Sequence, residues 1–200
     1  PQLPLHIRHS HPEWLVQRWT EQFGEEHTAA LCEWNQQPAP IHIRINALHP
    51  QQPTAANLRR FHPTAQAGFY GVDQPPRDAL SQGKCYVQDP STAIACELLA
   101  PQPGESVLDA CAAPGGKTAL IAQLMNNEGR IVACDSSPKR IPRLQENLRR
   151  MRVAIARTFE LDWTTLKGAP PWGALRLDRI LLDVPCSNTG VMRRRIDVRW

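Results

Sequence analysis

Two segments of this chain place reactive side chains in loops that follow apolar runs. Residues 106–118 read SVLDACAAPGGKT, and residues 179–190 read RILLDVPCSNTG. Each apolar run reaches an acid, Asp109 in the first segment and Asp183 in the second. Such loops are typical of the carboxyl edge of a parallel sheet, where α/β proteins bind their ligands. The two segments are therefore the first candidates for a functional site.

Two glycines in the first loop indicate a nucleoside-type cofactor. Gly115 and Gly116 lack Cβ atoms, which permits a positive φ and lets backbone N–H groups approach a ligand closely. Asp135 ends the next apolar run about 20 residues later, where a carboxylate accepts hydrogen bonds from ribose hydroxyls. Asp162 follows the third run and could accept a bond from an adenine amino group, although an ordinary loop acid before Trp163 would look the same.

The second segment offers a thiol for chemistry on a pyrimidine. Carbon 5 of cytosine is a poor nucleophile, and a thiolate that first attacks carbon 6 builds electron density at carbon 5 for methyl transfer. Cys186, directly after Pro185, would be placed for this attack, and Asp183 could hydrogen-bond the cytosine edge or amino group. The alternative is that Cys186 is buried as a small apolar residue, which the polar loop at 187–190 disfavours.

A phosphate-binding loop is the competing interpretation of the first segment. Residues 116–118 (GKT) end like such a loop, and Asp183 resembles the strand acid that holds magnesium in those NTPases. The spacing does not fit, because Cys111 stands where the motif needs a glycine. Pro114 also removes an N–H group from a loop that would cradle phosphates with N–H groups.

From Tyr86 onward, predicted strands alternate with predicted helices. The strands are 106–110, 130–134, 154–159 and 179–182; one helix follows Ser91 as its N-cap, one covers 118–125, and one has Ser137 as N-cap and Pro138 at its first position. This order predicts a parallel, doubly wound Rossmann-like α/β domain over residues 86–200. The sheet is expected to be incomplete at its C-terminal end.

Residues 1–85 predict a small α+β accessory domain. Prolines, histidines and glutamines are frequent there, and the apolar pattern is short and interrupted. A helix is expected over 12–23, a strand over 41–45 with one buried and one wet face, and a short helix over 55–61. Its cationic side chains are candidates for a second RNA surface: Arg44, Arg59 and Arg60.

Composition favours a cytoplasmic protein with an acidic partner. The net charge is +4, and basic residues gather at 140–152 and 193–195, although solvated helix faces would look the same. Six cysteines without a CxxC pair predict neither a zinc site nor a disulfide scaffold. The chain has no apolar run of about 18 residues and no basic-then-apolar leader, which argues against membrane insertion and secretion.

The two motifs resemble those of a known family. Residues 109–118 (DACAAPGGKT) and 183–194 (DVPCSNTGVMRR) are closely similar to motifs of the RNA (cytosine-5) methyltransferases of the NOL1/NOP2/Sun family. The segments 86–91 (YVQDPS) and 194–200 (RRIDVRW) look most like the bacterial 16S ribosomal RNA enzymes of its Sun/Fmu (RsmB) branch. The similarity spans roughly residue 86 to the end, and the accessory region more weakly.

The resemblance implies S-adenosylmethionine as the methyl donor and RNA, small-subunit ribosomal RNA in particular, as the acceptor, with no metal. It implies that Asp135 binds the ribose, Asp162 the adenine, and that Asp183 lies beside cofactor and target base. The loop expected to wrap the methionine and ribose parts comprises Cys111, Ala112, Ala113, Pro114, Gly115, Gly116 and Lys117. The residues expected to contact RNA are Arg193, Arg194, Arg195 and Arg199.

One departure from the family pattern concerns the nucleophile. In the family, the cysteine after the proline, here Cys186, helps to release the product, and the attacking cysteine belongs to a later Thr-Cys-Ser motif. That motif is absent from these 200 residues. The sequence is therefore interpreted as a fragment, with two open alternatives: Cys186 attacks instead, as in DNA cytosine methyltransferases, or the chain binds RNA and cofactor without catalysis.

Overall fold

The computed structural model describes residues 3–199, of which 198 and 199 are described by their backbone alone. The chain divides into two compact units: residues up to 39 together with those from 185 onward form unit 1, and residues 40–184 form unit 2. The boundary expected between residues 85 and 86 stays a prediction. None of the helices in the described residues is long and apolar enough to cross a membrane.

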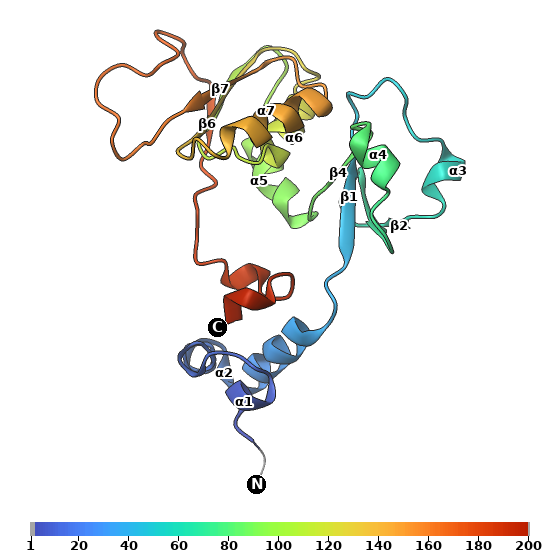
Figure 1. The fold of residues 1–200 in the computed structure, drawn as a ribbon, viewed down its shortest axis with the longest axis vertical. Coiled ribbons are helices and arrows are strands. Elements are labelled where there is room, and N and C mark those ends of the chain that lie inside the picture. The colour runs from blue at the N-terminus through green and yellow to red at the C-terminus, as the bar shows by residue number, and fades with distance from the viewer. Residues whose placement is uncertain (1–2, 200) are drawn as a thin grey trace. The chain divides into compact units, whose positions relative to one another are not determined.

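A parallel four-stranded sheet forms the larger part of unit 2. Its strands are β5 (Ser106–Asp109), β6 (Arg130–Asp135), β7 (Ala156–Glu160) and β8 (Arg179–Leu181), in the order β7-β6-β5-β8. The helices α5 (Ser91–Leu99), α6 (Gly116–Leu124) and α7 (Ile141–Arg150) lie next to these strands (Figure 1). The parallel strand pairings confirm the predicted α/β architecture. Such an architecture forms because alternating strands and helices cover each other's apolar faces.

Apolar side chains of the central strands and helices form the core of this sheet domain. Val107 and Ile131 of the sheet pack with Ile121 of α6 and Met125, all fully buried. Ala133 of β6 packs with Leu144 and Leu148 of α7. Burial on both faces explains why the central strands are continuous apolar runs rather than alternating ones.

Two predicted helix caps are wrong. Pro90 lies at the N-cap position of α5 and Ser91 is the first residue of the helix, so Ser91 does not cap it. Asp89 Oδ1 accepts the N–H of Ser91 at 3.0 Å and its hydroxyl at 2.7 Å. Ser137 donates its N–H to Asp135 Oδ1 at 2.9 Å and begins a turn. Residues 138–140 form that turn, and α7 therefore starts three residues later than expected.

An antiparallel sheet forms the rest of unit 2. Its strands are β1 (Ile41–Ile45), β2 (His62–Pro63), β3 (Phe69–Val72) and β4 (Cys85–Val87), in the order β2-β3-β1-β4, with the short helices α3 (Ala55–Leu58) and α4 (Arg77–Ser81) beside them (Figure 1). The strand predicted over 41–45 is confirmed, and the helix predicted over 55–61 ends at Leu58.

The prediction that one face of β1 is wet is wrong. Ile43 is fully buried on one face, and Arg44 on the opposite face is only 2% exposed. The Arg44 guanidinium donates to Gln88 Oε1 at 2.8 Å and also to Gln123 Oε1 of α6. Arg44 therefore joins the antiparallel sheet to the parallel one and is not available as an RNA-contacting surface residue.

Unit 1 is helical. It contains α1 (Leu5–Arg8), α2 (Glu13–Gln36) and the 3-10 turns η1 (Thr189–Val191) and η2 (Ile196–Arg199), drawn blue and red in Figure 1. Gly24 inside α2 has φ 81° and ψ 165°, so α2 consists of two helical pieces. The first piece matches the helix predicted over 12–23, and the second was not predicted.

Candidate cofactor and active site

Four acids lie at the carboxyl edge of the parallel sheet. Asp109 ends β5 and Asp135 ends β6, while Asp162 follows β7 and Asp183 follows β8. Carboxyl ends of parallel strands meet at one edge, so the four acids surround the loop that joins β5 to α6. The acids thus come from four strands that are neighbours in the sheet order, and their roles toward a cofactor stay predictions.

The glycines of this loop are required by the protein's own packing as well as by any ligand. Gly115 has φ 102°, and a Cβ there would stand 3.0 Å from Leu144 Cδ1 of α7. At Gly116, which begins α6, a Cβ would stand 3.1 Å from Tyr86 Cε1. The loop thus lies so close to side chains of α7 and β4 that a Cβ at either glycine would require the neighbouring side chain to shift by a few tenths of an ångström.

Asp135 is the most firmly held of the four acids. It is 2% exposed and accepts Ala113 N at 3.2 Å on Oδ2 and Ser137 N at 2.9 Å on Oδ1. Arg140 pairs with Oδ1 at 3.0 Å. A carboxylate has about four acceptor positions, so Oδ2 retains capacity for a donor such as a ribose hydroxyl. The residues fit the ribose end of a nucleoside cofactor.

Asp109 is a site residue that the sequence reasoning did not select. Its side chain is fully buried, and Thr118 Oγ1 donates to Oδ2 at 2.7 Å. The Cys111 N–H faces the carboxyl closely enough to lower its pKa in part, but Oδ1 makes no hydrogen bond of good geometry with any described residue. Burial raises the pKa of Asp109 to about 6. An unpartnered buried acceptor at the base of the loop is consistent with a ligand that brings a donor. The signal was present, since Asp109 is the acid directly before the loop.

An ion pair connects the two sequence motifs. Lys117 Nζ, in the first turn of α6, lies 2.6 Å from Asp183 Oδ2. The Lys117 side chain is 20% exposed and that of Asp183 is 50% exposed. The lysine that would reach phosphates in an NTPase instead neutralises the acid of the second motif, while part of that carboxylate stays accessible to a ligand.

The loop after β7 is held by local bonds and by a tryptophan. Asp162 Oδ1 accepts Thr164 N at 2.9 Å and Thr164 Oγ1 at 2.7 Å, and these bonds hold the pKa of Asp162 below its ordinary value. Trp163 Nε1 donates to Ala110 O at 2.8 Å, which ties this loop to the one after β5. The adenine contact of Asp162 stays a prediction, and Trp163 is a neighbour to which the sequence analysis assigned no role.

Cys186 belongs to unit 1, whereas Asp183 belongs to unit 2. The thiol of Cys186 is exposed, and its Sγ accepts Asn188 N at 3.4 Å. Burial as an apolar residue, the alternative weighed from the sequence, is therefore wrong. Cys111 in the cofactor loop is half-buried, and burial followed by the charges of Asp135 and Asp109 raises the pKa of its thiol. Its place in the loop suits contact rather than nucleophilic attack.

The C-terminal arginines that were expected to contact RNA differ in their surroundings. The guanidinium of Arg193 lies 4.5 Å from the centroid of the Trp34 ring and donates to Pro38 O at 2.7 Å. Arg195 pairs with Asp197 at 2.7 Å, and Arg194 is exposed. The side chain of Arg199 lies outside the described residues. The RNA contacts of these four residues stay predictions.

The described residues contain no group of three or more His, Cys, Asp or Glu side chains that could hold a metal ion. The four acids at the sheet edge are instead engaged by Thr118, Ala113, Thr164 and Lys117.

Comparison with known proteins identifies the family. The family model "16S rRNA methyltransferase RsmB/F" matches residues 96–200, which include the whole sheet edge and the Pro185-Cys186 segment. The chain belongs to the RsmB/F family of 16S rRNA methyltransferases. A second model, the ferredoxin-like domain of RsmF/B-like methyltransferases, matches residues 11–59. The resemblance found from the two motifs is confirmed.

Individual proteins that resemble this RsmB/F member align with most or all of its length. The probable ribosomal RNA small subunit methyltransferase B of Synechocystis is 34% identical over 99% of this chain and 46% of its own length. The crystal structure of PH0851 matches with a TM-score of 0.87 at 28% identity, over 100% of this chain and 48% of that one. The structure of a methyltransferase homolog from Pyrococcus horikoshii matches with a TM-score of 0.67 at 27% identity, over 78% of this chain and 55% of that one. The chain spans about half the length of the curated relatives it matches.

Proposed function

We propose that this chain provides the cofactor site and part of the catalytic machinery of an S-adenosylmethionine-dependent methyltransferase that modifies carbon 5 of cytosine in 16S ribosomal RNA. The observation that carries the proposal is that the first motif and Asp183, the first residue of the second motif, meet at one sheet edge, where Lys117 pairs with Asp183. The name of the Synechocystis relative, a small subunit ribosomal RNA methyltransferase, supports the substrate class.

The residues of this chain would divide the cofactor between them. Asp135 would accept hydrogen bonds from the ribose hydroxyls, and the backbone of residues 111–117 would follow the methionine part. Asp109 Oδ1 offers a buried acceptor to a donor on the same molecule. When bound, S-adenosylmethionine supplies an electrophilic methyl group. Exclusion of water around Asp109 and Asp135 strengthens their hydrogen bonds to the ligand.

Cys186 is the thiol best suited to act on the target base. Four cysteines are buried in the core, and burial raises the pKa of Cys85 to about 11 and that of Cys96 and Cys134 to about 12. A thiol is a nucleophile only as thiolate, so these side chains are unreactive. Cys186 is the exposed thiol of the chain. We assign to it either attack on carbon 6 of cytosine or release of the methylated product, with Asp183 hydrogen-bonded to the cytosine edge.

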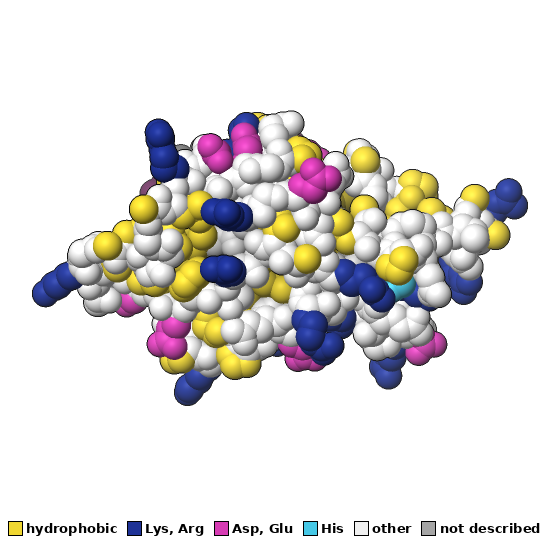
Figure 2. All heavy atoms as spheres, turned by 90° about the horizontal axis from the view of Figure 1, so that it is seen from above, with side chains coloured by type: hydrophobic (Ala, Val, Ile, Leu, Met, Phe, Trp, Pro, Cys, Tyr) yellow, Lys and Arg dark blue, Asp and Glu magenta, His cyan; other side chains and the backbone are white. Residues whose placement is uncertain are grey.

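The RNA strand is the proposed partner, and the cytoplasm is the proposed location. Figure 2 shows Lys and Arg side chains spread over the drawn face, with acidic side chains between them, rather than gathered in one patch. Phosphate contacts would then be distributed along the surface, with Arg193, Arg194, Arg195 and Arg199 as the candidates from the C-terminal segment. All six cysteines are free thiols, which agrees with a reducing compartment.

Methyl incorporation tests the proposal. A protein that carries this chain is incubated with S-adenosylmethionine labelled in its methyl group and with unmodified 16S ribosomal RNA, and the nucleosides are separated after digestion. We expect the label in 5-methylcytidine and its loss in Asp135→Ala, with the exposed acid variant Asp73→Ala as the matched control. Label in another nucleoside, or equal incorporation by Asp135→Ala, would contradict the proposal.

A further inference from the structure

A cavity lies in unit 2, within the antiparallel sheet region and apart from the cofactor loop. The cavity has a volume of about 610 Å³ and is lined by residues between Ile43 and Cys85. This volume falls within the range of roughly 300–1,000 Å³ that is usual for small-ligand sites. None of the four acids of the cofactor site lines it. The cavity is therefore a separate feature with its own set of side chains.

The floor of the cavity is apolar and includes an aromatic ring. Ile43 and Ile45 of β1 and Cys85 of β4 lie on the face of the sheet opposite to Arg44, and they form the floor together with Phe61. Phe61 is half-buried and contacts Tyr70 with ring centroids 6.3 Å apart. A planar, uncharged group such as a nucleobase can stack on such a surface.

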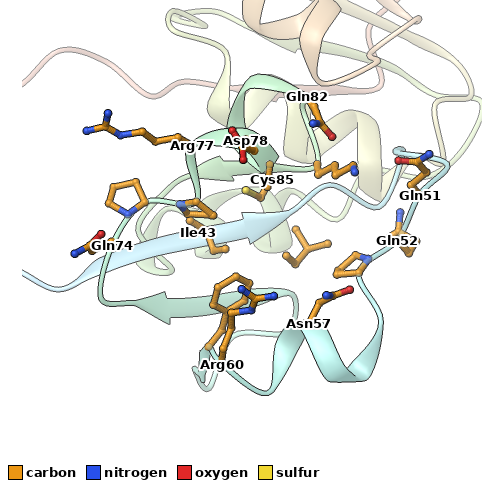
Figure 3. A pocket seen from close by; sticks show the side chains of 17 residues that line it. Ile43, Gln51, Gln52, Asn57, Arg60, Gln74, Arg77, Asp78, Gln82 and Cys85 are labelled. Atoms are coloured by element: carbon orange, nitrogen blue, oxygen red, sulfur yellow. The ribbon is translucent and has the colours of Figure 1, made fainter.

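Cations and amides surround this floor on two sides. Figure 3 shows Arg77, Asp78 and Gln82 above the β1 strand that carries Ile43, and Gln52, Asn57 and Arg60 below it. Gln51 and Gln74 also line the cavity. With Lys84, the lining holds three cations and one carboxylate, a net charge of +2. Such a charge favours an anionic ligand.

These polar side chains are not occupied by other parts of the protein. Arg60, Arg77 and Lys84 make no side-chain hydrogen bond or ion pair with any described residue. The amides of Gln51, Gln74 and Gln82 likewise have no partner there, and an amide offers both donors and an acceptor to a base edge. Gln52 and Asn57 are used locally, by the carbonyl of Asn46 and by Thr54.

We propose that this cavity binds an unpaired nucleotide of the substrate RNA, with its base on the Phe61 floor and its phosphates against Arg60, Arg77 and Lys84. The inference rests on the proposed function, because it takes the ligand from the RNA strand on which the enzyme acts. A concave site of this size accepts a base that is splayed out of a single strand, whereas a base inside a duplex cannot enter it.

Neighbouring arginines give a matched test. Arg60 lines the cavity and Arg59 does not, although both side chains are exposed. The affinity of the chain for a fluorescein-labelled single-stranded RNA of mixed sequence is measured by fluorescence anisotropy at several salt concentrations. We expect Arg60→Gln to weaken binding and to lower the salt slope by about 0.7, the value for one phosphate contact on a single strand. Arg59→Gln should leave both unchanged.

A second variant and a covalent probe address the base. Phe61→Leu keeps an apolar floor but removes the ring, and we expect RNA affinity to fall roughly ten-fold, since base stacking on aromatic side chains contributes that much or more. Photo-crosslinking with RNA that contains 4-thiouridine should attach to peptides from 51–61 and 74–85. Equal effects of Arg60→Gln and Arg59→Gln, or crosslinks confined to other segments, would overturn the proposal.

The two proposals fail in different ways. S-adenosylmethionine binding is measured on every variant by calorimetry, and Arg60→Gln should bind the cofactor as the unchanged chain does. Arg60→Gln could bind the cofactor, incorporate methyl groups and bind RNA as the unchanged chain does. That result would overturn the proposal that the cavity binds a nucleotide, and it would leave the proposed methyltransferase function in place.

Discussion

Lys117 Nζ and Asp183 Oδ2 lie 2.6 Å apart, and this contact joins residues that are 66 positions apart in the sequence. Lys117 belongs to the glycine loop that would hold the methyl donor, and Asp183 follows the strand that leads to the Pro185-Cys186 segment. The ion pair thus fixes the orientation of the acid that would lie between donor and base.

Replacement of the lysine separates orientation from stability. We expect Lys117→Met to change the free energy of unfolding by about 1 kcal/mol or less, because half of the Asp183 side chain is exposed to solvent. Affinity for S-adenosylmethionine should nevertheless fall, since Asp183 loses its partner and its fixed orientation. Calorimetric titration provides the measurement, and Lys139→Met, at an exposed lysine outside the loop, is the control. Unchanged cofactor affinity in Lys117→Met would contradict the role given to the pair.

Asp109 predicts a specific pH dependence of stability. Its pKa is raised from 3.8 to about 6 by burial, so the folded state binds the proton more tightly than the unfolded state. The stability contributed by the protonated form is fully present below about pH 4 and is lost as the pH rises through about 6. The change corresponds to on the order of 3 kcal/mol. Urea unfolding between pH 4 and 7 measures this loss in the unchanged chain, and Asp109→Asn should lack it. If the unfolding free energies of the two proteins changed in parallel with pH, the raised pKa of Asp109 would be contradicted.

Replacement of Gly115 by alanine should destabilise the protein through close packing as well as through backbone strain, and the two effects can be separated. Gly115 and Gly104 both have positive φ, at 102° and 89°, but a Cβ would meet Leu144 only at Gly115. Gly104→Ala should cost about 1–2 kcal/mol of unfolding free energy from strain alone. Gly115→Ala should cost about 1–3 kcal/mol more and should also lose cofactor affinity, because the loop must move away from α7. Chemical denaturation and calorimetry on both variants decide this, and equal losses would argue against the close packing.

Arg193 predicts a structural effect in unit 1. Its guanidinium contacts the Trp34 ring and donates to the carbonyls of Gln37 and Pro38. We expect Arg193→Ala to lower the free energy of unfolding by about 1–2 kcal/mol, and Arg193→Lys to recover little of it, because a lysine lacks the planar fork. Arg195→Ala, which removes an exposed ion pair with Asp197, serves as the comparison and should unfold like the unchanged chain. Equal stability of Arg193→Ala and Arg195→Ala would refute this contact as a stabilising one.

The acids at the strand ends could be located from the sequence because their positions depend on local pattern. Asp135 and Asp183 each end a continuous apolar run, and the parallel sheet then brings them to one edge. The cap of α5 was misassigned because Ser91 has a short polar side chain typical of an N-cap, yet Pro90 lies at that position and Ser91 donates to Asp89 instead. Which of these neighbouring residues begins the helix depends on local backbone geometry. Such competition between neighbouring caps is not visible in residue types alone.

Other features depend on partners that are distant in the sequence. The alternating pattern of the strand predicts that Arg44 lies at the surface, yet its side chain is buried. Its hydrogen-bond partner Gln123 is 79 residues away in the sequence. Arg193 reads as part of a basic run, and its partner Pro38 lies 155 residues earlier. A sequence pattern identifies the buried face of an element only where the neighbouring element is also known.

The central claim is that the loop of residues 111–117 holds S-adenosylmethionine. Its most direct test is calorimetric titration of this chain with S-adenosylmethionine and, in parallel, with ATP and magnesium. We expect the methyl donor to bind, Asp135→Ala to abolish that binding, and ATP with magnesium to give no heat of binding. Binding of ATP alone, lost in Lys117→Ala, would contradict the claim and would identify the loop as a phosphate-binding one.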